Sequence, residues 1–217
     1  MKNLFIALAT SIALAGPARS MENAPDGTTQ KTSDSQRSER SNRLDSLIAQ
    51  QNFDQLLYVL FPQTTQGKLP PLSAEDEAQD INWLSTQAVR GYVPLMYFLS
   101  WKLMSNDINE SRKWNARARI GVMLVQKECI SDPRSPWYLI FEGRGIANNM
   151  TVRDSDLLWY GAVDEALSWH ANGREHLSTS WYCGPTNVLP LPAATDARKA
   201  YWQKIKAHND AQLAKLQ

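Results

Sequence analysis

Cysteine and histidine are the side chains in this sequence whose types could support covalent or metal chemistry, and their spacing argues against both. Cys129 and Cys183 lie too far apart for a CxxC redox or zinc motif. His170 and His176 miss the i, i+4 spacing that places two metal ligands on one helical face. The chain has no HExxH or GxSxG motif. We therefore expect no metal site, no cofactor and no catalytic centre, and we predict that the protein is not an enzyme.

Aromatic residues are the stronger candidates for function, as contacts to another protein. All eight tryptophans lie between Trp83 and Trp202, and most follow a helical spacing that suits a core. Three Trp–Tyr pairs lie close to expected loops, and Trp, Tyr and Arg are enriched at interface hot spots. An expected turn at residues 142–145 adds an acidic and a basic candidate. Core packing and scattered surface charge are the alternative for each candidate. The predicted contact residues are Trp137, Tyr138, Glu142, Arg144, Trp159, Tyr160, Trp181 and Tyr182.

The first 20 residues have the pattern of a cleavable secretory signal. Lys2 supplies a positive start, an apolar run follows over residues 4–15, and small residues come next. The run is too short to cross a bilayer as a finished helix, and no later stretch is long and apolar enough. We therefore expect residues 1–20 to be removed and the protein to act in the periplasm without a transmembrane segment. A buried N-terminal helix is the alternative.

The rest of the chain divides into a leader and one helical domain. Residues 21–38 contain almost no large apolar side chain, so they cannot bury enough surface to offset the entropy of ordering. We predict a disordered leader there and a helical repeat domain over residues 39–217. Removal of Lys2 and Arg19 with the signal leaves 21 basic against 22 acidic residues. This balance offers no excess positive charge for nucleic acid or for an anionic membrane.

The two cysteines are predicted to form a disulfide. An even cysteine count in an oxidising compartment favours a bridge between Cys129 and Cys183, because exported free thiols are a liability. The bridge would close a loop of about 55 residues, which the chain-entropy model values at about 4 kcal/mol. Two buried free thiols are the alternative.

Apolar residues recur at three- and four-residue spacing through most of residues 39–217, which predicts helices. No segment shows the sustained alternation of apolar and polar residues that is typical of a strand. Ser73 is an expected helix N-cap, Asn106 and Asp107 can each cap a later helix, and Gly91 is an expected helix end. The run from Val93 to Met104 is apolar nearly all round, which is typical of a central core helix. Prolines at positions 185, 190 and 192 predict a long loop, with the last helix beginning at about Thr195. The predicted fold class is all-α, with short connectors that favour antiparallel neighbours or a solenoid.

An internal repeat is visible in two tryptophan–glycine units. Trp83 lies eight residues before Gly91, and Trp114 lies seven residues before Gly121. At these residues, and in the stretch QAVRGYVPL at 87–95, the chain resembles the Sel1-like subclass of tetratricopeptide-type repeats. The stretches FEGRGI at 141–146 and DEALSW at 164–169 are similar to later parts of that motif. Leu95 stands where the family usually has a small residue, and Asp80 stands where it has Ala.

The resemblance is best over residues 75–175 and implies both a fold and a function. The implied fold is a set of antiparallel helix pairs stacked as a short, divergent Sel1-like solenoid. Small exported proteins of this kind resemble immunity proteins that neutralise antibacterial type VI secretion effectors, including phospholipases, by stoichiometric binding. The expected partner is therefore a protein toxin. The alternative is an envelope scaffold or regulator that binds a membrane or polysaccharide-assembly partner.

Overall fold

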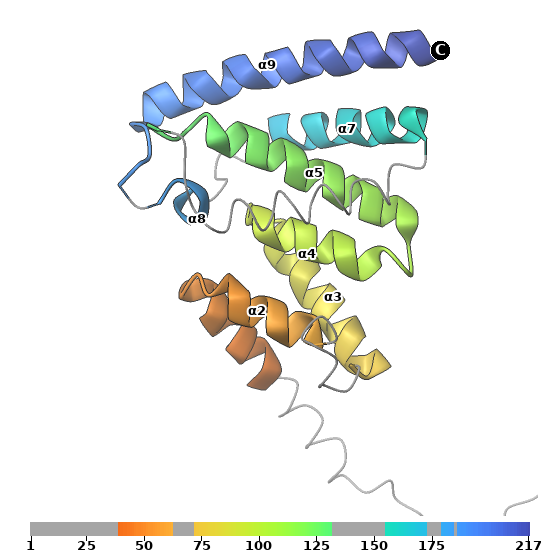
Figure 1. Ribbon diagram of the computed structural model, residues 1–217, viewed down its shortest axis with the longest axis vertical. Helices are drawn as coiled ribbons and strands as arrows, with labels where there is room; N and C mark the ends of the chain where they lie inside the picture. The colour runs from red at the N-terminus through yellow and green to blue at the C-terminus, as the bar shows by residue number, and fades with distance from the viewer. Residues whose placement is uncertain (1–38, 63–71, 132–154, 173–178, 185) are drawn as a thin grey trace, which may run out of the picture. The chain divides into compact units, whose positions relative to one another are not determined.

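The described part of the chain is almost entirely helical (Figure 1). The structure is a computed structural model that describes residues 39–62, 72–131, 155–172, 179–184 and 186–217. These residues contain no strand, only an isolated antiparallel bridge between Cys129 and Val188, so the predicted all-α class is confirmed for them. Residues 39–49 are helical, and they are followed by α2 (Phe53–Leu60), α3 (Ala74–Ala88), α4 (Val93–Leu103), α5 (Ile108–Gln126), α7 (Asp156–Ala171), α8 (Ser180–Cys183) and α9 (Leu191–Leu216).

The predicted signal at 1–20 and the predicted leader at 21–38 lie outside the described residues. Within the described ranges, no helix is long and apolar enough to cross a membrane.

Four of the described helices begin at a polar side chain that caps them. Asn52, Ser73, Asp107 and Ser155 each accept a hydrogen bond from the backbone N–H three residues later, at 3.0–3.4 Å. Such a cap satisfies one of the backbone donors that a helix start leaves without a partner, and its loss costs about 1 kcal/mol. The predicted caps Ser73 and Asp107 are therefore confirmed.

The start of the last helix differs from its prediction. α9 begins at Leu191 rather than near Thr195, and Pro192 lies in its first turn. The prolines at positions 190 and 192 predict a loop, but the fixed φ and missing N–H of proline are also tolerated in the first turn of a helix. Gly91, by contrast, lies in the turn that follows the end of α3 at Ala88, in keeping with its prediction as a chain-turning residue, and its φ of 90° is a conformation that other residues rarely adopt.

The helices pack against their neighbours in chain order. α3 packs on α4, α4 on α5, α5 on α7 and α7 on α9. α4 and α5 run antiparallel, as do α7 and α9, whereas α5 and α7 run in the same direction (Figure 1). The α7–α9 contact shows the register, since Trp202 donates to the carbonyl oxygen of Leu167 and Asn209 donates to that of Tyr160. α5 also contacts α8 and α9, so it lies at the centre of this arrangement.

α4 and α5 pack directly against each other in the core. Nine of the eleven residues of α4 are buried, which confirms its prediction as a central helix. Ser100 of α4 and Ser111 of α5 exchange buried hydrogen bonds with each other's carbonyl oxygens, at 2.9 and 2.8 Å. Gly121 lies inside α5 rather than at a chain turn, and a Cβ there would be 2.7 Å from Val93 Cγ2. The glycine of the second predicted repeat unit therefore permits close helix approach, whereas Gly91 turns the chain.

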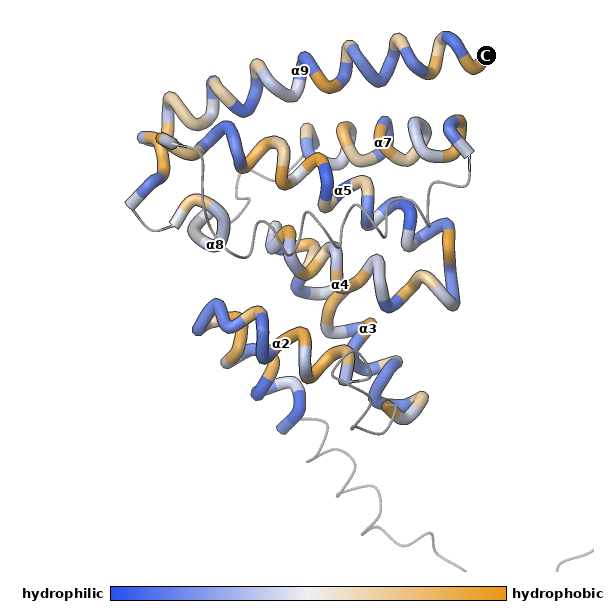
Figure 2. Tube along the Cα trace, viewed as in Figure 1, coloured by the Kyte–Doolittle hydropathy of each residue, from blue (hydrophilic) through white to orange (hydrophobic). Residues whose placement is uncertain are grey.

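α9 differs from α4 in exposing most of its surface. Only Ala194 and Asn209 of its residues are buried, and Figure 2 shows hydrophilic and hydrophobic positions interspersed along it. Tyr201, Trp202 and Ile205 are partly buried and pack against the core. α9 is thus held along one face by α7, and its other face is open to solvent.

Candidate functional site

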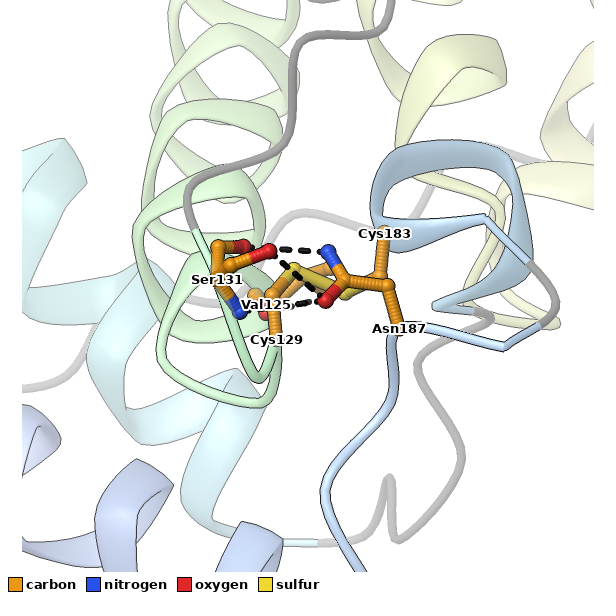
Figure 3. The surroundings of a disulfide bond; sticks show 5 residues. All are labelled: Val125, Cys129, Ser131, Cys183 and Asn187. Carbon is orange, nitrogen blue, oxygen red and sulfur yellow. Dashed lines mark hydrogen bonds between the residues drawn. A yellow bond between two sulfur atoms is a disulfide. The ribbon is translucent and has the colours of Figure 1, made fainter.

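The disulfide joins the end of α5 to α8, as the sequence predicted (Figure 3). Cys129 and Cys183 are bonded with their Cα atoms 5.3 Å apart. α5 ends at Gln126, so Cys129 lies just beyond the helix in the short antiparallel bridge to Val188.

Backbone and side-chain hydrogen bonds reinforce the link that the disulfide makes. Ile130 donates its N–H to the carbonyl oxygen of Asn187 at 2.9 Å, and Leu189 donates to that of Glu128 at 2.8 Å. The Asn187 side chain accepts from the N–H and hydroxyl of Ser131 and donates to its carbonyl oxygen, at 2.9–3.1 Å (Figure 3). We call residues 128–131, 183–184 and 186–191 the disulfide junction.

Charged and aromatic contacts attach the disulfide junction to α9. The Glu128 carboxylate, which is 9% exposed, lies 3.2 Å from an Arg198 guanidinium nitrogen. Burial raises the pKa of the Glu128 carboxyl, and the charge of Arg198 partly opposes that change. The same oxygen makes no hydrogen bond of good geometry, so the pair is held by charge. Beside it, the Lys127 ammonium lies 4.8 Å from the Tyr201 ring centroid. These contacts fix the junction on two helices at once.

Two large apolar side chains of the disulfide junction are exposed to solvent. Leu191 is 75% exposed and Ile130 is 60% exposed, more than any other large apolar side chain in the described ranges. Single exposed apolar residues are common on protein surfaces and need no explanation. These two differ because a disulfide, a bridge and an ion pair hold the backbone that carries them, and a preorganised surface loses less entropy on binding.

The predicted contact residues lie elsewhere, and most of those described are buried. Trp159 is 5% exposed, Trp181 4% and Tyr182 1%, while Tyr160 is partly buried. The rings of Trp181 and Tyr182 contact each other edge to face, 5.3 Å apart. These pairs therefore pack in the core, which was the alternative reading of each, because their tertiary neighbours cover them. Trp137, Tyr138, Glu142 and Arg144 lie outside the described residues.

Sequence reasoning missed the surface that the junction offers, although one signal pointed to it. Ile130 follows Cys129 directly, and Leu191 lies in the proline-rich stretch that leads from Cys183 into α9. Apolar residues beside a bridged cysteine or inside a Pro-rich connection are candidates for a braced, exposed surface.

A buried ion-pair network lies at another place in the helix arrangement, between residues 39–49, α3 and α4. Arg40 donates two hydrogen bonds to the Asp80 carboxylate, at 2.9 and 2.8 Å. Lys102 pairs with Glu77 at 2.5 Å and lies 3.6 Å from Asp80. Asp80 is completely buried, and burial raises the pKa of its carboxyl although Arg40 and Lys102 oppose the change. Charges this deep are tolerated because each has a partner.

His170 packs in the core and is not placed for chemistry. His170 donates from Nε2 to the carbonyl oxygen of Arg117 at 2.8 Å, and its ring meets that of Trp169 edge to face. Burial lowers the pKa of the His170 imidazole to about 4, so the ring is neutral at physiological pH. Within the ranges that the structure describes, His, Cys, Asp and Glu do not gather into a group that could hold a metal ion.

Comparison with known proteins adds no relative, since no protein-family model, no curated protein and no solved structure matches the chain.

Proposed function

We propose that this protein is an exported protein-binding module that neutralises an antibacterial type VI secretion effector by stoichiometric binding. The toxin class that we put forward first is a phospholipase. The observation that carries the binding role is the disulfide junction, where Ile130 and Leu191 are exposed at 60% and 75% on a braced backbone. Exposed apolar side chains on a rigid backbone can fill a hollow in the surface of a partner protein with little loss of entropy.

The helix arrangement supports a divergent repeat as the scaffold for this surface. Helices α3, α4, α5, α7 and α9 contact one another in chain order, which is the pattern of a quasi-one-dimensional stack. Trp83 and Trp114 are each 8% exposed, in keeping with a tryptophan that fills space between layers. Export to the periplasm is supported by the disulfide, because structural disulfides persist in oxidising compartments.

The proposal predicts that a toxin gene lies beside the gene for this protein, and that toxin is the material for the test. Deleting the gene should make cells sensitive to toxin-bearing siblings, and the purified protein should inhibit the toxin at one-to-one stoichiometry. Unchanged fitness of the deletion strain, together with full toxin activity in excess purified protein, would contradict immunity. Association with an envelope biosynthetic complex instead would favour the scaffold alternative.

The contact surface has its own test. Ile130→Glu and Leu191→Glu should each weaken toxin binding at least tenfold, because each buries a charge in the complex. Tyr58→Glu is the matched control, since Tyr58 is 47% exposed on α2, away from the disulfide junction. Binding is measured by calorimetry, with circular dichroism as the check on folding. Equal affinity of all three variants would overturn the assignment of the surface.

A further inference from the structure

α9 has three faces, and one of them carries basic residues and no acidic residue. Trp202 and Asn209 lie on the face that packs against α7, where each donates a hydrogen bond to a carbonyl oxygen. Lys206 lies on a second face, where its ammonium is 2.8 Å from Asp210 and 3.4 Å from Asp164. Residues three or four positions apart share one side of a helix. The third face, which we call the basic face, is made of such residues: Ala193, Ala197, Ala200, Lys204, His208, Ala211 and Lys215.

The two lysines of the basic face are exposed and carry uncompensated charge. Among the described residues neither Lys204 nor Lys215 has a carboxylate partner, unlike Lys206. The rise of a helix places them about 17 Å apart along the axis. A third cation precedes them, because the Lys127 ammonium lies 4.8 Å from the ring centroid of Tyr201, three residues before Lys204. Lys127 adjoins the disulfide junction, so the positive charge continues from the junction along α9.

The positive charge of α9 is a local feature of the chain. The helix has two acidic residues against five basic ones. Residues 21–190 carry 16 basic and 20 acidic residues, so the rest of the chain has an acidic excess. Salt screens charges that are more than about 10 Å apart, and an approaching molecule therefore senses the charge of the face that it meets.

We propose that the basic face of α9 binds an acidic surface of the protein partner. Opposite charges on the two surfaces speed association and fix its orientation. The alanines between the lysines keep the face low, so the partner can approach closely while Lys204 and Lys215 reach its carboxylates. The identity of the partner as the toxin rests on the proposed function, whereas the preference for an acidic protein surface does not.

Other occupants fit the basic face less well. A second copy of this chain would set the lysines of one basic face against those of the other. A helix that binds an anionic membrane inserts large apolar side chains, whereas the basic face offers only alanine beside its polar residues. Single-stranded nucleic acid is bound through aromatic residues on which its bases stack, and the basic face has none.

Reversing the two charges tests the contact with the toxin. The Lys204→Glu, Lys215→Glu double variant should associate with the toxin at least tenfold more slowly than wild type in about 0.02 M salt, and the difference should shrink in about 0.5 M salt. Arg43→Glu, Arg119→Glu is the matched control, because both arginines are exposed on other helical segments and the change in net charge is the same. Stopped-flow fluorescence measures the rates, and circular dichroism checks folding. Equal rates for the two double variants would overturn the proposal.

A second probe separates this proposal from the proposed function. An alanine-based helical peptide with one row of glutamates should shift the amide resonances of residues 200–215 saturably, and the same peptide with glutamines should not. The absence of a saturable shift would overturn the preference for an acidic surface. Binding of phosphatidylglycerol vesicles or of DNA that depends on Lys204 and Lys215 would overturn the assignment to a protein. Peptide binding by a protein that does not bind the toxin would contradict the proposed function and support the basic face.

Discussion

At the scale of single residues, buried polar groups connect parts of the chain that are distant in sequence. Asp80 on α3 is completely buried and accepts two hydrogen bonds from Arg40, forty residues earlier. Asp45, on the same N-terminal helical segment, accepts from Trp83 Nε1 at 3.1 Å and from the Gln87 amide at 3.0 Å. These bonds fix the position of residues 39–49 on α3, because a shift of this segment along α3 would break them.

Replacing the buried carboxylate should be strongly destabilising. Asp80→Ala leaves Arg40 and the buried Lys102 with one carboxylate fewer, and breaking a buried ion pair costs about 3 kcal/mol. Urea unfolding followed by circular dichroism measures the change in the free energy of unfolding. Asp54→Ala, at an exposed position in the first turn of α2, should cost below about 1 kcal/mol. Similar losses for the two variants would show that the network contributes nothing specific.

His170 should make stability fall in mild acid. The folded state holds the imidazole neutral with a pKa of about 4, while the unfolded chain takes up a proton near pH 6.5. The unfolded state therefore binds more protons between these values, so stability present above pH 6.5 is lost as pH falls towards 4. The shift sets an upper limit of about 3 kcal/mol, and because the ring is partly exposed we expect about half of that.

The pH effect is measured by urea unfolding of wild type and His170→Gln from pH 7.5 down to 4.5. The variant should lose less stability over this range than wild type. His208→Gln, on the exposed face of α9, should follow the wild-type profile. Parallel profiles for wild type and His170→Gln would show that another group causes the acid sensitivity.

At the scale of helices, two glycines inside helices have opposite surroundings. Gly121 in α5 faces Val93 of α4, and an added Cβ would meet Val93 Cγ2 at 2.7 Å and His170 Cε1 at 3.4 Å. Gly161 in α7 has nothing within 4 Å of that position. The α4–α5 distance therefore depends on Gly121, whereas Gly161 only weakens its own helix.

The two glycine-to-alanine substitutions should change stability in opposite directions. Gly161→Ala gains helix propensity, which raises the free energy of unfolding by about 1 kcal/mol. Gly121→Ala gains the same term but must displace a fully buried Val93, and overpacking of this kind costs about 2 kcal/mol, for a net loss of about 1 kcal/mol. Thermal unfolding of both variants measures the difference. A stabilised Gly121→Ala would mean that the two helices separate easily.

At the scale of the whole molecule, one covalent bond ties the end of α5 to a segment that is distant in sequence. The Cys129–Cys183 disulfide joins residues 54 positions apart and ties the end of α5, the central helix, to the segment that leads into α9. The bridge lowers the conformational entropy of the unfolded chain. It also constrains the backbone that carries the exposed residues Ile130 and Leu191.

Removing the disulfide should cost both stability and partner binding. A Cys129→Ser, Cys183→Ser double variant should lose about 4 kcal/mol, the value of the chain-entropy model for this loop length. Guanidinium unfolding measures the loss, and reduced wild-type protein should unfold at the same denaturant concentration as the double variant. Toxin affinity should fall in both. Unchanged affinity for the toxin after reduction would show that binding by the disulfide junction does not depend on the disulfide.

Several features of this protein follow from the sequence by itself because they depend on residues only a few positions apart. Helical periodicity, the caps Ser73 and Asp107, the turn at Gly91 and the buried character of α4 all belong to this kind. The cysteine pairing could also be predicted, since two cysteines allow only one intramolecular bridge. The start of α9 was placed too late because proline suits both a loop and a first helical turn.

Exposure was decided by the tertiary structure alone. Trp181 and Tyr182 are residue types that are common at protein interfaces, but they are buried in the core. Ile130 and Leu191 are residue types that are common in cores, but they are exposed to solvent. Periodicity identifies which face of a helix is apolar, but whether that face is covered depends on segments far away in the chain. For the same reason, the pairing of Asp80 with Arg40 has no signature within any short stretch of sequence.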